Sequence, residues 1–180
     1  MRSLRRFELT LAASFLLGLA AMPAHAVTVS IAPPETTVTV GDDFYVRSVT
    51  TAFPDLKAFH LIYSFSSTII TSITVDPGDV LTQSGNPYSA FPGPDNTTPT
   101  GSIQYDAAML TGSSAGPGIL GFFKFHAAVI GDSPVQCVTV DFRDSNNVQT
   151  LPACVSGLVH VVGVVPVRAS TWARLKVLYR

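Results

Sequence analysis

The sequence predicts an all-β sandwich that ends in a short C-terminal helix. Short runs rich in Val, Ile, Thr, Phe and Tyr alternate apolar with polar residues, and Gly, Pro, Asn and Asp separate the runs, which is typical of strands joined by turns. No stretch of helical periodicity interrupts these runs before the last residues of the chain. The nine candidate strands, a number that suits a sandwich, cover residues 27–32, 36–40, 43–51, 56–65, 69–75, 102–107, 119–129, 135–142 and 154–165.

Alternation within the strands predicts which side chains form the core. In the run 56–65 the odd-numbered residues from Phe59 to Phe65 are large and apolar, so we expect them to face inward and to leave His60 and Ile62 on the other face of the strand. The same reasoning predicts three further buried residues: Phe123, Phe125 and Val129. These phenyl rings are then part of the core and not a platform for a ligand.

Residues 83–101 form the longest break between predicted strands. The segment is rich in Pro and Gly, with Asn, Ser and Thr between them, and predicts a long loop that is either functional or mobile. Within it, Asn96-Thr97-Thr98 matches the acceptor pattern for N-glycosylation, which matters only if the host glycosylates.

The N-terminal residues have the three parts of an export signal. Arg2, Arg5 and Arg6 precede an apolar stretch, and the small residues Ala24 and Ala26 form a cleavage site. We expect cleavage after Ala26 and a mature protein that is secreted or held at the cell surface. The apolar stretch is shorter than the roughly 20 residues of a membrane-spanning helix, so we do not expect it to act as a membrane anchor. We expect no transmembrane segment in the mature chain either. The chain then divides into a signal peptide (1–26), a sandwich domain (27–166) and a C-terminal tail (167–180).

Two cysteines, Cys137 and Cys154, lie in the predicted mature chain. An exported protein folds where disulfides persist, so we expect the two to be bonded. A bridge that closes a loop of this size adds on the order of 3 kcal/mol to stability. A metal or redox pair would need CxxC spacing and nearby histidine ligands, and the sequence has neither.

The charges separate the sandwich domain from the tail. Residues 27–166 contain four Lys/Arg against eleven Asp/Glu, a net charge of −7, whereas residues 167–180 contain four Lys/Arg and no acid, a net charge of +4. An acidic domain argues against nucleic acid as a partner.

The sequence contains no recognisable catalytic or metal-binding constellation. Three histidines, His60, His126 and His160, fall in predicted strands and are interpreted as solvated strand residues. No nucleophile elbow of the G-x-S-x-G kind occurs. The Asp and Asn side chains of 141–147 could offer oxygen ligands to calcium, but they lack the spacing of an EF-hand loop and favour an Asx turn. Paired acids lie in turn signatures, where structural roles are favoured: Asp42, Asp43, Asp76 and Asp79. We therefore expect neither enzymatic activity nor a cofactor.

Five segments, in order along the chain, resemble segments of cohesin domains. They are 40–46 (VGDDFYV), 58–65 (AFHLIYSF), 72–81 (SITVDPGDVL), 118–128 (GILGFFKFHAA) and 141–147 (DFRDSNN). The resemblance implies a nine-stranded jelly-roll β-sandwich, a fold that cohesins share with the family 2 and family 3 carbohydrate-binding modules. It also implies a protein partner of the dockerin type, because cohesins bind these calcium-loop helical modules of polysaccharide-degrading enzymes.

The sequence departs from the cohesin pattern at three places. Ile62 stands where a cohesin commonly has a polar residue facing the partner, Ser66-Ser67 replaces the usual Asp-Pro, and the cysteine pair is unusual for the family. The alternative function is carbohydrate binding, which needs exposed aromatic rings that stack on sugar. The predicted sandwich domain has no Trp, so its candidate rings are Tyr88, Phe91 and Tyr105. Together with His60 and Ile62 they make up the candidate binding surface.

The tail has a different pattern from the strands. Four residues are placed at helical spacing, and Ser170 could cap the helix: Trp172, Leu175, Leu178 and Tyr179. An isolated helix of about ten residues is marginal in water, so it needs something to pack against. The alternatives are docking on the sandwich itself, binding or sorting through a partner, and weak association with a membrane surface.

Overall fold

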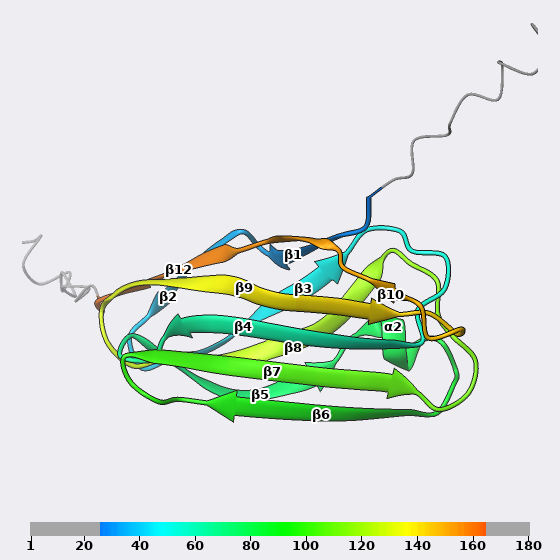
Figure 1. The fold of residues 1–180 in the computed structure, drawn as a ribbon. Coiled ribbons are helices and arrows are strands. Elements are labelled where there is room, and N and C mark those ends of the chain that lie inside the picture. Colours follow the sequence, from blue (N-terminus) through cyan, green and yellow to red (C-terminus); the bar gives the residue numbers. More distant parts are fainter. Residues whose placement is uncertain (1–25, 165–180) are drawn as a thin grey trace, which may run out of the picture.

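A computed structural model describes residues 26–164, which form twelve strands and one short helix in two packed sheets (Figure 1). The predicted signal peptide lies outside the described residues apart from Ala26, so its cleavage stays a prediction. The predicted tail helix, with Trp172, Leu175, Leu178 and Tyr179, also lies outside them. Within the described part of the chain, no helix is long and apolar enough to cross a membrane.

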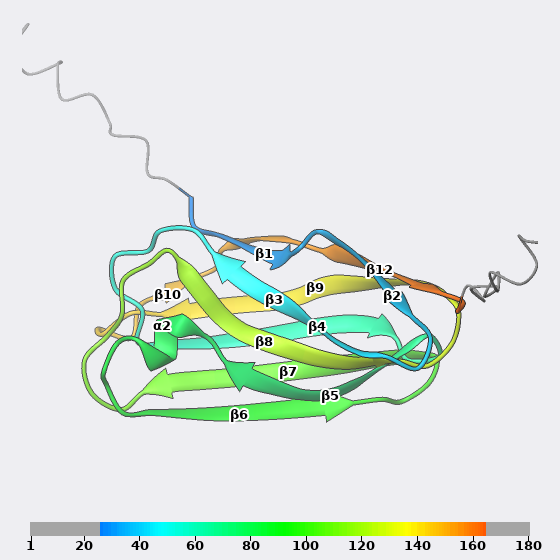
Figure 2. The ribbon, with the colours of Figure 1, turned by 180° about the vertical axis from the view of Figure 1, so that it is seen from behind.

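The five-stranded sheet is antiparallel apart from one parallel pair, β1 with β11. Figure 2 shows this sheet toward the viewer. Its strands, in spatial order, are β11 (Ala153–Val155), β1 (Thr28–Ala32), β3 (Asp43–Thr50), β8 (Gly118–Ala127) and β5 (Ile70–Pro77).

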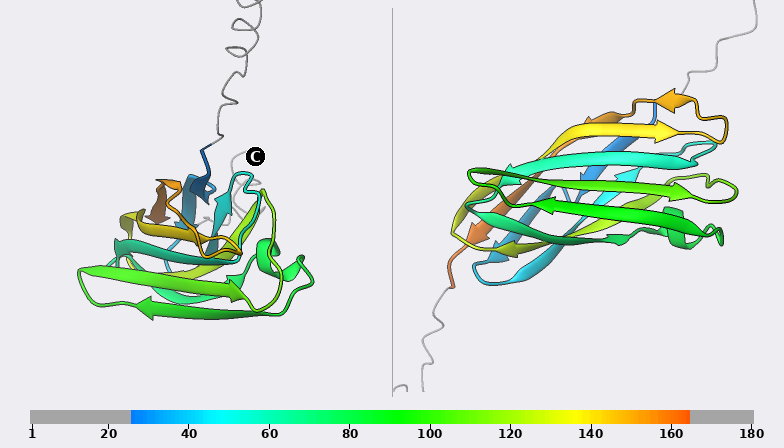
Figure 3. Two further views of the ribbon diagram at one scale, coloured as in Figure 1. Left: turned by 45° about the vertical axis from the view of Figure 1, so that its right-hand side comes forward. Right: turned by 60° about the horizontal axis from the view of Figure 1, so that its bottom comes forward.

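The seven-stranded sheet faces the viewer in Figure 1 and packs on the first sheet as a second layer (Figure 3). β2 and β12 pair in parallel, β10 (Gln149–Thr150) pairs with β9 off the main path, and the other pairs are antiparallel. The spatial order is β2 (Glu35–Thr39), β12 (Gly157–Val162), β9 (Gly131–Arg143), β4 (Ala58–Ser66), β7 (Thr100–Met109) and β6 (Tyr88–Asp95). The short helix α2 (Asp79–Thr82) lies at one end of the sandwich.

The core lies between the two sheets, and the predicted alternation places most of it correctly. Every odd-numbered residue of β4 from Phe59 to Phe65 is buried, and so are Phe123 and Phe125 of β8. The prediction for Val129 is wrong, because the side chain is 54% exposed. β8 ends at Ala127, and the next residues turn back so that the Val129 amide donates to the Ile69 carbonyl.

The predicted long loop 83–101 is also wrong in part, because it contains the eight-residue strand β6. Pro92 and Pro94 argue against a strand in the middle of a sheet, since proline cannot donate a ladder hydrogen bond. β6 accommodates both prolines because it is an edge strand that pairs with β7 alone. The predicted last strand, 154–165, divides into β11 and β12, which belong to different sheets.

The predicted disulfide is confirmed. Cys137 of β9 and Cys154 of β11 are bonded, with their Cα atoms 6.1 Å apart. Because β9 and β11 belong to different sheets, the bond connects the two layers covalently.

Asn96 connects the layers on another side. Its Oδ1 accepts hydrogen bonds from the Ser72 amide (2.7 Å) and hydroxyl (2.9 Å), and its Nδ2 donates to the Ser72 carbonyl (2.9 Å). Ser72 lies on β5, the edge strand of its sheet, at an irregularity in the pairing with β8. The Asn96 amide bonds the backbone amide and carbonyl of Ser72 as a neighbouring strand would. The side-chain nitrogen that N-glycosylation would modify is therefore occupied in the folded protein.

Candidate functional site

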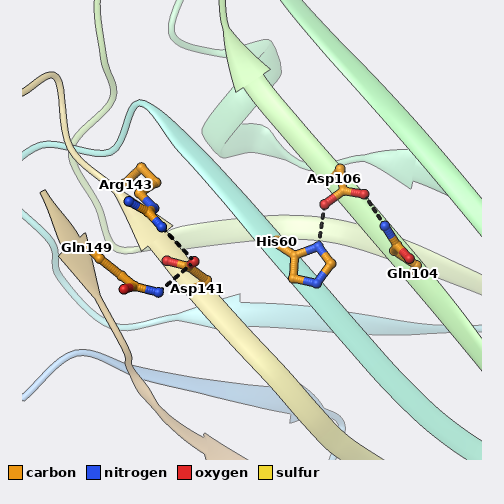
Figure 4. Close-up of polar contacts among 6 residues, drawn as sticks. All are labelled: His60, Gln104, Asp106, Asp141, Arg143 and Gln149. Carbon is orange, nitrogen blue, oxygen red and sulfur yellow. Dashed lines mark hydrogen bonds and ion pairs between the residues drawn. The ribbon is translucent and has the colours of Figure 1, made fainter. Parts of the chain in front are cut away.

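One row of side chains crosses the outer face of the seven-stranded sheet. The strand register places Phe91 of β6 opposite Asp106 of β7, Asp106 opposite His60 of β4, and His60 opposite Asp141 of β9. Residues directly opposite each other in neighbouring strands point to the same face. His60 therefore lies between two carboxylates, as Figure 4 shows.

Hydrogen bonds hold this row in place. His60 Nδ1 pairs with one carboxylate oxygen of Asp106, and Gln104 Nε2 donates to the other. On the far side of His60, Asp141 Oδ2 accepts a hydrogen bond of 2.8 Å from Gln149 Nε2 and a longer one of 3.4 Å from Arg143 (Figure 4). Both oxygens of Asp106 and Oδ2 of Asp141 are thus paired within the sheet, whereas Asp141 Oδ1 is buried without a hydrogen-bond partner among the described residues.

Next to this row the face has an open hollow of about 290 Å³. It exists because small side chains meet there: Ala58 and Ala108 are direct cross-strand partners, and neither fills the space above the sheet. Phe91 and Arg143 also line the hollow. The hollow is suited to one small or aliphatic side chain of a binding partner, set between an aromatic ring and a guanidinium.

The structure brings together three of the five predicted surface residues. His60, Ile62 and Phe91 all lie on this face, where Phe91 is 65% exposed and His60 and Ile62 are half-buried. Tyr88 is 36% exposed, but it is the cross-strand partner of the buried Met109, so its ring lies on the core side of β6.

Tyr105 is a correction to the predicted surface. Its side chain is completely buried, with the ring centroid 5.5 Å from that of Phe59 and 6.1 Å from that of Phe123. Tyr105 lies on the same face of the strand as the apolar residues Ile103 and Ala107, so the periodicity of the strand could have identified it as a core residue. The three rings considered for sugar stacking therefore do not form a common platform.

Each histidine in the described part of the chain has an aspartate partner directly across a strand pair. Besides His60 with Asp106, His126 Nδ1 lies 2.9 Å from Asp43 and His160 Nδ1 lies 2.7 Å from Asp132. The contact with His126, followed by that with Lys124, holds the pKa of Asp43 below its ordinary value. The predicted surface histidines are thus paired and not simply solvated. The sequence could not show this, because the partners are 28 to 83 residues apart.

The acidic turn after β9 has the structural role predicted for it. Asp144 Oδ1 accepts hydrogen bonds from the Asn146 amide (2.9 Å) and the Val148 amide (2.7 Å), which is an Asx turn. Across residues 26–164, no group of three or more His, Cys, Asp or Glu side chains is placed to hold a metal ion.

No family model matches the sequence, and a comparison with curated proteins finds no match either. Solved structures do match the fold. A non-cellulosomal cohesin from the hyperthermophilic archaeon Archaeoglobus fulgidus has a TM-score of 0.61 and 17% identity, covering 76% of this chain and 91% of that one. A cohesin from Clostridium thermocellum, solved as a type I cohesin–dockerin complex, has a TM-score of 0.63 and 14% identity, covering 81% and 99%.

A type II cohesin domain from the cellulosome of Acetivibrio cellulolyticus gives a similar result, with a TM-score of 0.62 and 12% identity over 74% of this chain and 95% of that one. The resemblance seen in the sequence is therefore confirmed for the fold: the chain has the two-sheet sandwich of cohesin domains.

Proposed function

We propose that the protein is a non-enzymatic, extracytoplasmic binding module of the cohesin type, which binds a dockerin-like protein on the outer face of its seven-stranded sheet. The observation that carries this proposal is the His60 row, in which hydrogen bonds within the sheet hold His60, Asp106 and Asp141 in place beside the exposed ring of Phe91. Several of the matching cohesins were solved in complex with dockerins, which supports a partner of this class.

The size of the face fits a protein partner. β9, β4, β7 and β6 lie side by side, and β4 has nine residues. With strands about 4.8 Å apart and about 3.4 Å per residue, the four strands present roughly 600 Å². A specific protein interface buries about 800 Å² on each partner, so side chains and neighbouring turns can supply the difference.

The chemistry of the face also favours protein contact. Both carboxylate oxygens of Asp106 are already paired with residues of the same sheet, so a partner can cover this carboxylate without leaving it unpaired. Ile62 and Phe91 add apolar area, and an aromatic anchor beside a hollow is typical of the centre of an interface.

The same contacts support a non-enzymatic role. The side-chain hydrogen bonds of His60, His126 and His160 within residues 26–164 go to aspartates, and no serine or cysteine nucleophile adjoins these rings there. A nucleophilic mechanism would need such a group next to the imidazole. The disulfide between the sheets supports an oxidising compartment.

The test measures binding of the exported protein to a panel of type I and type II dockerins by calorimetry, with calcium and with a chelator. Ile62→Asp places a charge at the centre of the proposed interface and is expected to weaken binding by roughly 2–5 kcal/mol. Ile73→Asp is the matched control, because Ile73 is 40% exposed on β5 of the other sheet. Failure to bind any dockerin, or equal losses for the two variants, would contradict the proposal.

A further inference from the structure

A second hollow, of about 500 Å³, lies on the opposite side of the molecule, on the outer face of the five-stranded sheet. Figure 2 shows that sheet toward the viewer. Its lining consists of Pro33, Tyr45, Arg47, Asp76 and Phe122. The register of β5, β8 and β3 sets Asp76, Phe122 and Arg47 in one row across the sheet. A phenyl ring therefore lies between a carboxylate and a guanidinium.

The two charges of this row are available to a ligand. Within the described residues, neither Arg47 nor Asp76 has a side-chain hydrogen bond or an ion-pair partner, although both are exposed. Phe122 on the intervening strand keeps them about 10 Å apart, because they are separated by two strand spacings. This contrasts with the face around His60, where the carboxylates bind side chains of their own sheet.

Of the two aromatic rings in the hollow, Tyr45 is exposed and Phe122 is half-buried. Tyr45 is 47% exposed and lies on β3 two residues before Arg47, on the same face of the strand. The Lys124 ammonium lies 6.0 Å from the centre of the Tyr45 ring and forms its ion pair with Asp43 at 3.0 Å, and within the described residues it forms none with Asp76. Tyr45 and Phe122 are diagonal neighbours on adjacent strands, so their rings can contact one ligand together.

This arrangement selects a ligand with a flat apolar face and hydroxyl groups around its rim. A pyranose with equatorial hydroxyls has both: its C–H face packs on aromatic rings, and its hydroxyls can bond a guanidinium on one side and a carboxylate on the other. The net charge of −7 over residues 27–166 repels acidic polysaccharides. A sheet face open at its sides also leaves room for a chain to continue in both directions.

We propose that this hollow binds a segment of a neutral polysaccharide built from pyranoses with equatorial hydroxyls, with one sugar ring on Phe122 and Tyr45 and with hydroxyls bonded by Arg47 and Asp76. This site is independent of the proposed protein interface, since the two lie on opposite outer faces of the sandwich. Both sites can then be occupied at once.

The test titrates the isotopically labelled exported protein with cellohexaose and with xylohexaose to millimolar concentration, followed by NMR. Saturable shifts of residues around Tyr45 and Phe122 are expected. Tyr45→Ala and Arg47→Ala are each expected to weaken binding about tenfold or more, because stacking and charge-assisted hydrogen bonds contribute on this scale. Tyr45→Phe keeps the ring and is expected to keep binding.

Phe91→Ala is the matched control, because it removes an exposed ring from the opposite face. It should leave sugar binding unchanged, and Tyr45→Ala should leave dockerin binding unchanged, with thermal unfolding showing that every variant is folded. The proposal is overturned if the folded wild type binds neither oligosaccharide, if binding survives Tyr45→Ala, or if Tyr45→Ala abolishes binding of a dockerin instead.

Discussion

Two buried tyrosines should respond in opposite ways to the same substitution. The Tyr63 hydroxyl of β4 lies 2.7 Å from the hydroxyl of Ser48 on β3, so this hydrogen bond joins the two sheets inside the core. The Tyr105 hydroxyl is also buried but has no hydrogen-bond partner within the described residues. Both rings meet Phe123 edge-on, at centroid distances of 5.1 and 6.1 Å, so replacement by Phe keeps the aromatic packing and removes only the hydroxyl.

The magnitudes follow from what each change leaves behind. Tyr63→Phe leaves the Ser48 hydroxyl buried and unpaired, which costs about 1–3 kcal/mol. Tyr105→Phe removes a buried hydroxyl that has no hydrogen-bond partner within the described residues. This substitution is therefore expected to leave the free energy of unfolding unchanged or to raise it by up to about 2 kcal/mol. The double variant Ser48→Ala/Tyr63→Phe removes both partners together and should recover most of the stability that Tyr63→Phe loses.

Thermal and urea unfolding measure these effects directly. In a domain of this size, 1 kcal/mol moves the Tm by roughly 3–5 °C, so the two single variants should separate clearly. The reasoning is refuted if Tyr105→Phe destabilises as much as Tyr63→Phe. It is equally refuted if the effects of Ser48→Ala and Tyr63→Phe simply add in the double variant.

Three further predictions concern pH and the connections between the sheets. Burial raises the pKa of Tyr63 to about 12 from an ordinary value of 10.0. The contribution of Tyr63 to the free energy of unfolding should therefore be constant below pH 10 and be lost as the pH rises from 10 to 12. Urea midpoints that stay level between pH 10 and pH 12 would contradict this. Asn96→Ala removes three hydrogen bonds to β5 and should cost about 1–3 kcal/mol in urea unfolding, whereas the control Thr98→Ala destroys the glycosylation pattern and should cost nothing. Reduction of the Cys137–Cys154 bond should lower the free energy of unfolding by about 3 kcal/mol, and a native protein whose thiols react before reduction would show that the bond is not formed.

Periodicity in the sequence predicts the central strands well and the edges poorly. In β4, strict alternation of large apolar residues identifies the buried face, because both neighbours of the strand enforce one register. In β6 the prolines and glycine conceal the strand, since an edge position tolerates residues that a central strand does not. Tyr105 is a different case: an aromatic side chain suggests a sugar-stacking surface, whereas its two-residue spacing from Ile103 and Ala107 places it in the core.

The two candidate sites depend on contacts between distant segments. The His60 row joins residues of β6, β7, β4 and β9, and no local pattern in any one strand shows which strands become neighbours. The same holds for Arg47, Phe122 and Asp76. Alternation in β3 places Tyr45 and Arg47 on one face, but only the pairing with β8 and β5 adds the phenyl ring and the carboxylate.

The prolines of β6 also affect how molecules of this protein meet at high concentration. Pro92 and Pro94 are two residues apart, so their nitrogens point to the same edge of the strand, the one that β7 does not use. The outer edge therefore lacks two successive donors, and the added strand of another molecule could not complete a hydrogen-bonded ladder there. At high concentration, copies of the protein should therefore not form continuous intermolecular β-sheets through this edge. Association is left to the side chains on the faces of the sandwich.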